Sequence, residues 1–290
     1  MVEYLAGNRI RGTDAERLAI GGVPSLTDSG ISKSNCKAYY NFEQTSGNLT
    51  NIATTSNGYS NGLGSGADGT NSGATTGETG KVGYAWSFVT NDYIDSNIST
   101  VIMDTPNTFS VSMWINPDSS SNWSDVLIAQ NVGTTDQGMS IWLNNLKPTL
   151  YLEGAGGGSQ YTKYEPNNTV STGVWNHVVV TVVGQSSRGS ATTGINMYIN
   201  GTSQTVSNTG SAGSVGTMGV NADIFIASKH GTTGFFDGLI DELSIWDRVL
   251  TSTEVSTLYE ANYNIIDGSI FYTTDTNKEY VLYNNAWTEL

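Results

Sequence analysis

The residues best suited to chemistry are two adjacent acids, Asp241 and Glu242, in the middle of residues 239–246. The alternating pattern of this stretch predicts a strand, so we expect one of the two acids to face inward. A buried carboxylate needs a cation, a metal ion or several N–H donors as its partner. The sequence leaves these partners open, and Arg248 is one basic candidate.

Three aromatic residues in polar segments are candidates for binding a sugar. Trp123 lies in the polar loop 119–125, and Tyr161 and Tyr164 lie in residues 160–165. Sugar binding needs an exposed ring that stacks on a sugar face, with Asn, Asp or Gln side chains that hold the hydroxyls; an exposed large apolar side chain is informative in this respect. The alternative for each ring is packing against its own domain. The tryptophans in predicted strands are expected in the core: Trp86, Trp114, Trp142, Trp175 and Trp246.

Other common site types lack the residues they require. The chain has two histidines, His177 in an apolar stretch and His230 in a loop, and one cysteine, Cys36. These residues assemble neither a zinc cluster nor a disulfide framework. The net charge of −14 argues against nucleic acid and against an anionic membrane surface as partners. No apolar run approaches the roughly 20 residues of a membrane-spanning helix.

Short strands and turns must position these residues. The chain is rich in Gly, Ser, Thr and Asn and carries many Tyr and Trp residues, which favours β structure. Residues 109–115 alternate, and residues 173–183 form the most apolar stretch, which we expect to be a central strand. Residues 57–83 are almost wholly Gly, Ser, Thr and Asn, and they are expected to form a long loop. Many strands with turns between them predict a sandwich of two sheets.

One short helix is predicted directly after residues 239–250. Thr251 and Glu254 have the spacing of a capping box, and Leu250 and Val255 fit a hydrophobic staple. The helix therefore lies near the C-terminal end of the predicted sandwich.

The chain divides into three parts. Residues 1–34 form an arm with few apolar residues, in which residues 13–20 are a candidate for a short capped helix. Residues 35–263 form the sandwich. Residues 264–290 form a C-terminal segment with a predicted β-hairpin. The arm is expected to lie on the sandwich or on a neighbouring molecule, and the hairpin on the sandwich or on copies of itself, because an isolated hairpin is marginal in water.

The body resembles the laminin-G-like, concanavalin-A-like family through motifs that follow one another in the family's order. These are Tyr40-Asn-Phe-Glu43, Ala85-Trp-Ser-Phe88, Phe109-Ser-Val-Ser-Met-Trp-Ile115, Trp175-Asn-His-Val178, Met197-Tyr-Ile-Asn-Gly201 and Gly238-Leu-Ile-Asp-Glu-Leu-Ser-Ile-Trp246. The resemblance implies an all-β, concanavalin-A-like jelly-roll sandwich of two antiparallel sheets. Such domains often bind glycans or proteins and often hold a calcium ion.

The resemblance also implies where a structural calcium ion would bind. The site would join the turn after the first strand to the last strand, with Asp241, Glu43 and Asn48 as ligands, because calcium takes oxygen ligands. No other cofactor is expected.

Glycoside hydrolases of this fold resemble the chain in architecture and place their acids as Glu-x-Asp-x-x-Glu on one strand. The chain lacks that motif. Retaining hydrolysis needs two carboxylates about 5.5 Å apart, whereas adjacent strand residues such as Asp241 and Glu242 point to opposite faces. We therefore expect no enzymatic activity.

The C-terminal segment is similar to segments of phage tail-fibre and other virion proteins. The matching residues are Gly268-Ser-Ile-Phe-Tyr272, Thr274-Asp-Thr-Asn277, Tyr283 and Trp287. The N-terminus lacks the basic and then apolar pattern of a signal peptide, so release by lysis would explain how a domain of extracellular type reaches the outside. The sequence thus favours an oligomeric virion surface or fibre protein that contacts neighbouring subunits through its arm and hairpin and host glycans through its sandwich. The alternatives are a free-standing carbohydrate-binding module of a microbial surface protein and, least favoured, a glycoside hydrolase.

Overall fold

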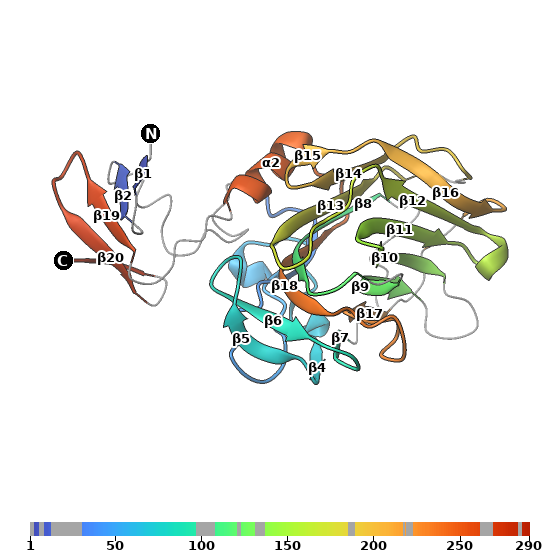
Figure 1. Ribbon diagram of the computed structural model, residues 1–290, viewed down its shortest axis with the longest axis horizontal. Coiled ribbons are helices and arrows are strands. Elements are labelled where there is room, and N and C mark those ends of the chain that lie inside the picture. The colour runs from blue at the N-terminus through green and yellow to red at the C-terminus, as the bar shows by residue number, and fades with distance from the viewer. Residues whose placement is uncertain are drawn as a thin grey trace.

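The structure is a computed structural model that describes residues 3–5, 9–12, 31–96, 108–120, 123–130, 137–184, 189–216, 218, 223–261, 269–283 and 286–290. The candidate helix at residues 13–20 lies outside these ranges. The described residues form a sandwich of two large antiparallel sheets and a separate small sheet (Figure 1). Within the described ranges, the predicted all-β sandwich with one short helix near its C-terminal end is confirmed.

The first large sheet has 8 strands. From edge to edge they are β16 (Val206–Ala212), β12 (Tyr161–Pro166), β11 (Lys147–Glu153), β10 (Gly138–Asn144), β9 (Ser124–Gln130), β17 (Asp223–Ile226), β7 (Tyr93–Asp95) and β4 (Thr70–Ser72). Three short 3-10 helices, η1 (Thr55–Asn57), η2 (Gly64–Ala67) and η3 (Gly157–Ser159), lie in the connections.

The second large sheet is also 8-stranded. Its order is β15 (Thr202–Ser203), β14 (Ile195–Ile199), β13 (Asn176–Val182), β8 (Phe109–Pro117), β18 (Gly238–Trp246), β6 (Tyr84–Phe88) and β5 (Thr75–Thr79), and β3 (Cys36–Tyr40) also pairs with β18. The strand β13 is central and all of its residues are buried, as its apolar sequence predicts.

Residues 57–83 do not form the uninterrupted loop that their composition predicts. They contribute η2 and the strands β4 and β5, which pair with β7 and β6. Composition misled here because both strands lie at the edge of a sheet, where a strand gains backbone hydrogen bonds on one side without needing many apolar side chains.

The main core fills the space between the two sheets. On β8 the predicted apolar face of Phe109, Val111, Met113 and Ile115 is fully buried there. Met139, Ile141 and Leu143 of β10 come from the opposite sheet, together with Leu150 and Leu152 of β11. Because strand side chains alternate, the residues between these core positions must lie on the outer faces of the sandwich.

The outer face of the second sheet is covered by the helix α2 (Ser252–Ala261) and by residues that follow position 31. Val255 and Leu258 of α2 pack with Tyr39, Tyr198 and Trp246 in a second apolar cluster. This outer face is therefore a second core and not a free surface.

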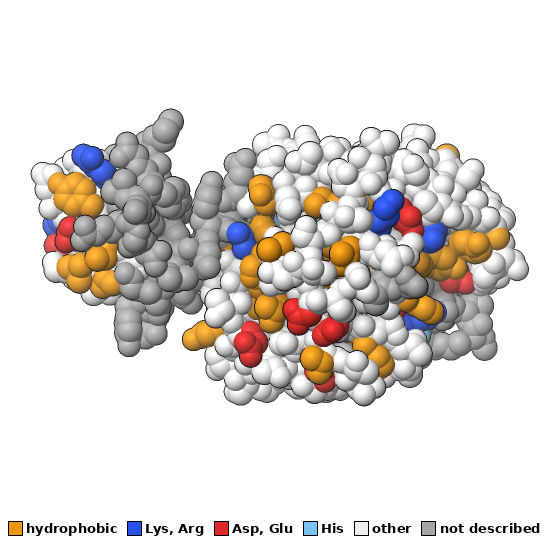
Figure 2. Space-filling model, viewed as in Figure 1, with side chains coloured by type: hydrophobic (Ala, Val, Ile, Leu, Met, Phe, Trp, Pro, Cys, Tyr) orange, Lys and Arg blue, Asp and Glu red, His pale blue; other side chains and the backbone are white. Residues whose placement is uncertain are grey.

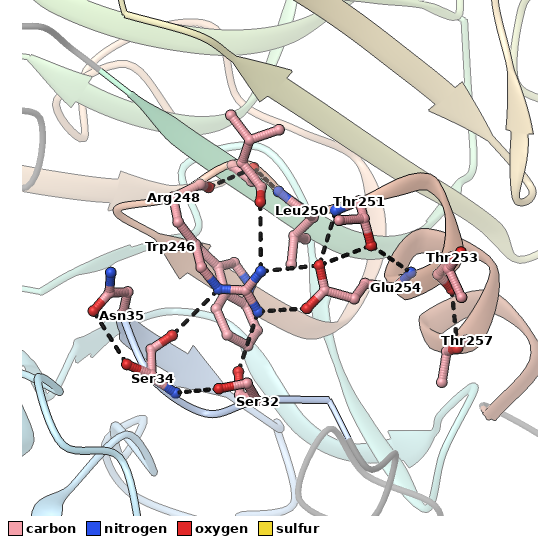
Figure 3. Close-up of polar contacts among 12 residues, drawn as sticks. Ser32, Ser34, Asn35, Trp246, Arg248, Leu250, Thr251, Thr253, Glu254 and Thr257 are labelled. Carbon is pink, nitrogen blue, oxygen red and sulfur yellow. Dashed lines mark hydrogen bonds and ion pairs between the residues drawn. The ribbon is translucent and has the colours of Figure 1, made fainter.

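The predicted capping box starts α2 (Figure 3). The Glu254 amide donates to Thr251 Oγ1 at 3.2 Å, and the Thr251 amide donates to Glu254 Oε2 at 2.8 Å. Arg248 donates to both carboxylate oxygens of Glu254, at 2.9 and 2.8 Å, and to the carbonyls of Ser32 and Ser34. One guanidinium thus links the last strand, the helix and the segment before β3.

Both ends of the chain meet in the small sheet. The sequence analysis assigns them to two separate parts, the arm (1–34) and the C-terminal segment (264–290). The strands β1 (Glu3–Leu5) and β2 (Arg9–Gly12) come from the N-terminus, and β19 (Ile270–Thr273), β20 (Glu279–Tyr283) and β21 (Ala286–Glu289) from the C-terminus. The pairing of β2 with β19 is parallel, and β19 and β20 form an antiparallel hairpin that buries Phe271 opposite Tyr280. None of the helices in the described ranges is long and apolar enough to span a membrane.

Candidate functional site

A groove of about 520 Å³ lies against the first sheet. It is lined by Trp123, Asp125, Gln130, Ser140, Trp142, Asn144, Tyr151, Glu153, Gly158, Lys163 and Lys229. Most of these residues belong to four neighbouring strands, β9 to β12. They occupy the positions between the core residues, so the groove lies on the outer face of this sheet.

Strand alternation and one bulge place the lining residues. On β10, Ser140, Trp142 and Asn144 alternate with core residues, and on β11 Tyr151 lies between two core leucines. The pairing of β9 with β10 shifts register between Ile141 and Trp142, so that Asp125 pairs with Trp142. A bulge of this kind re-aims side chains, and here it places an acid beside the central indole of the groove.

Four aromatic rings form a row that crosses the strands diagonally. The ring centroids of Trp123 and Trp142 are 6.4 Å apart, those of Trp142 and Tyr151 5.4 Å, and those of Tyr151 and Tyr161 5.3 Å. Trp142 pairs with Thr149 and Tyr161 with Glu153, each two residues from Tyr151, which gives the diagonal course. Trp123 is 49% exposed and Lys229 Nζ lies 5.5 Å from the centroid of its ring.

Asp125 is the most unusual polar group in the groove. Only 1% of the residue is exposed, and neither carboxylate oxygen accepts a hydrogen bond of normal geometry from the described residues. Burial raises the pKa of Asp125 to about 8, and the charge of Lys229 and the nearby indole N–H of Trp123 oppose part of this shift. Gly234 has a φ of +62° and approaches so closely that a Cβ there would lie 1.9 Å from Asp125 Oδ2. The Asp125 carboxyl thus packs against the backbone of Gly234 on one side and lines the groove on the other.

Gln130 and Glu153 lie in one register row across the sheet, in which Gly138 pairs with both residues. Gln130 is buried, and its Oε1 also lacks a hydrogen-bond partner among the described residues. Glu153 is 5% exposed. Lys163 forms an ion pair with Glu165 at 3.3 Å. The groove thus combines an aromatic floor with buried oxygen atoms, an arrangement typical of a ligand-binding site.

The structure brings two of the three predicted sugar-binding residues to this site. Trp123 lines the groove, and Tyr161 ends the aromatic row. Tyr164 does not contribute, because its side chain faces the core between the two sheets. There it is fully buried in the core, and its hydroxyl donates to the carbonyls of Gly189 and Ala191 at 3.0 and 2.9 Å. The prediction for Tyr164 was wrong because Tyr161 and Tyr164 are three residues apart on a strand and so face opposite sides.

Sequence reasoning missed Trp142, Tyr151 and Asp125. The prediction that Trp142 is a core residue was wrong, since Trp142 is partly exposed and lines the groove. The signal was present in the sequence. Met139, Ile141 and Leu143 occupy every second position of the strand, so Trp142, which lies between two of them, is on the opposite face.

The predicted acid pair lies in the second sheet, away from the groove. Both acids are buried, at 0% exposure for Asp241 and 6% for Glu242. The sequence predicts burial for only one of them, so the structure buries one acid more than expected. The register of β18 shifts between Asp241 and Ser244, and Glu242 has a φ of 50°, which breaks the simple alternation. The Val82 amide donates to Asp241 Oδ2 at 2.9 Å, and Tyr39 Oη donates to Glu242 at 2.7 Å. Arg248 is instead bound to Glu254.

The residues expected to bind calcium fit that role in part. Asp241 Oδ1 is buried and has no hydrogen-bond partner among the described residues. Burial, reinforced by the charges of Glu242 and Glu43, raises the pKa of Asp241, and burial raises the pKa of Glu43 to about 7. A cation would relieve both effects. Asn48 does not fit, because it is exposed and its Oδ1 accepts from the Asn71 amide of β4. Within the described ranges no three His, Cys, Asp or Glu residues form a metal-binding group.

His177 is a core histidine. Its Nε2 lies 2.8 Å from Ser112 Oγ, and its ring stacks on Trp114 with centroids 5.0 Å apart. Burial lowers the pKa of His177 to about 3, so the ring is neutral.

Comparisons with known proteins agree with the fold. Residues 88–256 match the family model of the concanavalin A-like lectin/glucanases superfamily. The chain is similar to domain 4 of an extracellular arabinanase from Geobacillus stearothermophilus, in complex with arabinotriose, at 24% identity and a TM-score of 0.51, over 78% of this chain and 98% of that domain. No curated protein matches the sequence.

Two toxin domains have the same fold. The binding domain of Paraclostridial Mosquitocidal Protein 1 is 15% identical, with a TM-score of 0.55, over 87% of this chain and 66% of that one. The binding domain of Botulinum Neurotoxin DC, in complex with SialylT, is 10% identical, with a TM-score of 0.53, over 80% of this chain and 52% of that one. At these identities the similarity is one of fold.

Proposed function

Because this chain belongs to the concanavalin A-like lectin/glucanases superfamily, we propose that it is a non-enzymatic glycan-binding protein whose binding site is the groove on the first sheet. The row of aromatic rings along this groove carries the proposal. Aromatic rings pack against the apolar faces of sugars, and the polar groups beside them hold hydroxyls. The arabinanase domain that binds arabinotriose supports a sugar ligand by analogy of fold alone.

The charges on the visible face of the sandwich do not favour a phosphate-rich polymer as the ligand. Charged side chains are sparse and scattered over the visible face of the sandwich (Figure 2). Among the described residues on this face, no dense basic patch of the kind that phosphate-rich polymers require is visible.

A glycan array probed with the full chain tests the proposal. We expect binding to a defined set of oligosaccharides, with loss of that binding in Trp142→Ala. The matched control is Tyr84→Ala, which removes an aromatic ring that is 45% exposed on the second sheet, outside the groove. Equal loss in both variants, or no binding by the wild-type chain, would contradict the proposal.

The spacing of the acids supports a non-enzymatic role. Asp125 and Glu153 line the groove from β9 and β11, two strands apart. Asp125 pairs with Trp142, which pairs with Thr149, so Glu153 lies four residues further along its strand. Strand spacings then put the two Cα atoms roughly 16 Å apart, whereas glycoside hydrolysis needs carboxyl groups about 5 to 9.5 Å apart. Release of reducing sugar that disappears in Asp125→Asn would overturn this part of the proposal.

The finer proposal concerns the setting of the domain. We propose that the protein is a surface or fibre component of a virion, with the sandwich displayed outward and the small sheet in contact with neighbouring subunits. The small sheet collects both ends of the chain, which supports an attachment role for it. Multi-angle light scattering on the full chain should show an oligomer. Phe271→Asp, which charges the core of the small sheet, should give a monomer that still binds glycan.

A monomeric wild-type chain would favour the alternative proposal, a free-standing carbohydrate-binding module of a microbial surface protein. The small sheet would then close the chain on itself without contacting other subunits.

We also propose one structural calcium ion, with Asp241 and Glu43 among its ligands. The support is the unpartnered Asp241 Oδ1 and the raised pKa values of both carboxyls. Calcium would be bound by oxygen ligands between the turn that contains Val82 and the strand β18. Its role would be to stabilise the fold, because Asp241 is fully buried.

A further inference from the structure

The groove contains buried oxygen atoms that no residue of the described chain satisfies with a hydrogen bond of normal geometry. These atoms are both carboxylate oxygens of Asp125 and Oε1 of Gln130, and both residues line the groove. Leaving a buried polar atom unpaired costs free energy. A ligand that forms hydrogen bonds with all three atoms would recover that cost. The three atoms therefore indicate which chemical groups the ligand carries.

The distance between the two residues indicates the length of the ligand. Asp125 and Gln130 belong to the same strand, β9, and five residues of extended chain separate their Cα atoms by about 15 Å. The aromatic row starts at the Asp125 end, where Asp125 pairs with Trp142, and runs diagonally away from β9 to Tyr161, which lies three strands across the sheet from Gln130. A single sugar ring is too short to reach both Asp125 and Gln130, so the ligand is a chain of several sugar units.

Hydroxyl groups suit these atoms better than charged groups do. A hydroxyl both donates and accepts, so it pairs with Asp125 in either protonation state and with Gln130 Oε1. A carboxylate or sulfate only accepts, and it would meet Gln130 Oε1 as an unpaired acceptor. Glu153, also buried in this groove, adds like-charge repulsion toward an anionic ligand.

Cations that line the groove already have partners. Lys163 pairs with Glu165 at 3.3 Å. Lys229 lies over the Trp123 ring, and its charge acts on Asp125. To pair with an anionic glycan, one of these lysines would have to leave its present partner. Glu165 would then lose its ion pair, or the Trp123 ring would lose its contact with a cation.

We propose that the groove selects an uncharged, hydroxyl-rich oligosaccharide, with Asp125 and Gln130 as the residues that bind its hydroxyls at the two ends of β9. This inference rests on the proposed glycan-binding function and names the ligand class for the same groove. Asp125 and Gln130 are therefore specificity-determining residues.

The test measures the affinity of the full chain for matched pairs of oligosaccharides. The neutral members are arabinotriose, cellotriose and galactotriose, and the charged members are trigalacturonic acid, a sialylated trisaccharide and a sulfated trisaccharide, all also presented on a broader array. We expect the best neutral ligand to bind at least about tenfold more tightly than any charged one. It should also bind more tightly than its own monosaccharide.

Variants then test whether Asp125 and Gln130 bind ligand hydroxyls or only stabilise the fold. Asp125→Leu and Gln130→Leu should each weaken the neutral ligand about tenfold or more, because ligand hydroxyls lose their partners. Asp125→Asn keeps one donor and one acceptor, so it should retain affinity within about threefold. Glu78→Gln, an exposed acid on β5 of the other sheet, is the matched control and should have no effect. Thermal unfolding of each variant verifies that it is folded.

The outcomes distinguish this inference from the function on which it rests. Binding that favours charged glycans, or that is unchanged in folded Asp125→Leu, would overturn the selectivity and leave glycan binding standing. Absence of binding to every glycan would overturn both.

Discussion

The outer faces of the two large sheets start from the same kind of strand and end in different roles. On the second sheet, α2 and the segment after residue 31 cover the outward side chains, and Trp246 is fully buried beneath them. On the first sheet the equivalent side chains line a groove, and Trp142 of β10 is partly exposed. Whether a tryptophan on a strand is a core residue or lines a groove therefore depends on what covers it.

The acids on the two faces show the same contrast. Asp241 and Glu242 are closed off from the surface and receive hydrogen bonds from Val82 and Tyr39. Asp125 is equally buried but lines a groove, and neither of its oxygens accepts a hydrogen bond of normal geometry within the described chain. Burial raises the pKa of both aspartates, so the pKa alone does not distinguish Asp241 from Asp125. The two acids differ in that Asp125 lines an open groove.

The largest expected effect comes from breaking the covered face. Trp246→Ala removes a fully buried ring and should lower the free energy of unfolding by about 3–5 kcal/mol. Trp142→Ala, on the open face, should lower it by less than about 1 kcal/mol. Chemical denaturation of both variants measures the difference. Equal losses would show that the groove is a packed core and not a binding surface.

Calcium should act on the covered face only. At a calcium concentration of about 100 times the dissociation constant, one bound ion stabilises the fold by about 2.7 kcal/mol. We expect calcium to raise the melting temperature of the wild-type chain and a chelator to reverse the rise. Asp241→Asn should abolish the response, while Asp125→Asn should retain it. A wild-type melting temperature that is insensitive to calcium would contradict the proposed ion.

The pH dependence of stability tests the acid on the open face. The pKa of Asp125 is raised to about 8 from 3.8, so between these values the unfolded chain has lost a proton that the folded chain still holds. The contribution of Asp125 to stability is thus fully present below about pH 4 and decreases as the pH rises to about 8. Asp125→Asn should remove this decrease and stabilise the protein at pH 8, with little change at pH 4. Thermal unfolding across this range tests it, and a pH-independent difference between the two proteins would refute the assignment.

Sequence patterns predicted the fold well because its signals are local. The alternation of residues 109–115, the apolar run of β13 and the capping box of Thr251 and Glu254 each specify an element without reference to the rest of the chain. The pairing of β2 with β19 joins the two ends of the chain, and no local pattern encodes such a contact.

The site was only partly predictable for a related reason. Trp123 is identifiable because its neighbours are polar, and Tyr161 because it lies in a polar segment. Trp142 and Tyr151 lie in strands, where side-chain direction follows from alternation but coverage by other elements does not. Asp125 required the bulge between β9 and β10, which is a property of two paired strands and not of either sequence alone.

The most direct test of glycan binding in the groove is the affinity of the full chain for its best array glycan, measured by titration calorimetry for wild type, Trp142→Ala and Tyr84→Ala. We predict at least about a tenfold loss in Trp142→Ala, in the range expected when an aromatic contact with the ligand is removed, and an unchanged affinity in Tyr84→Ala. Unchanged affinity in a folded Trp142→Ala variant would contradict the assignment of the groove as the glycan-binding site.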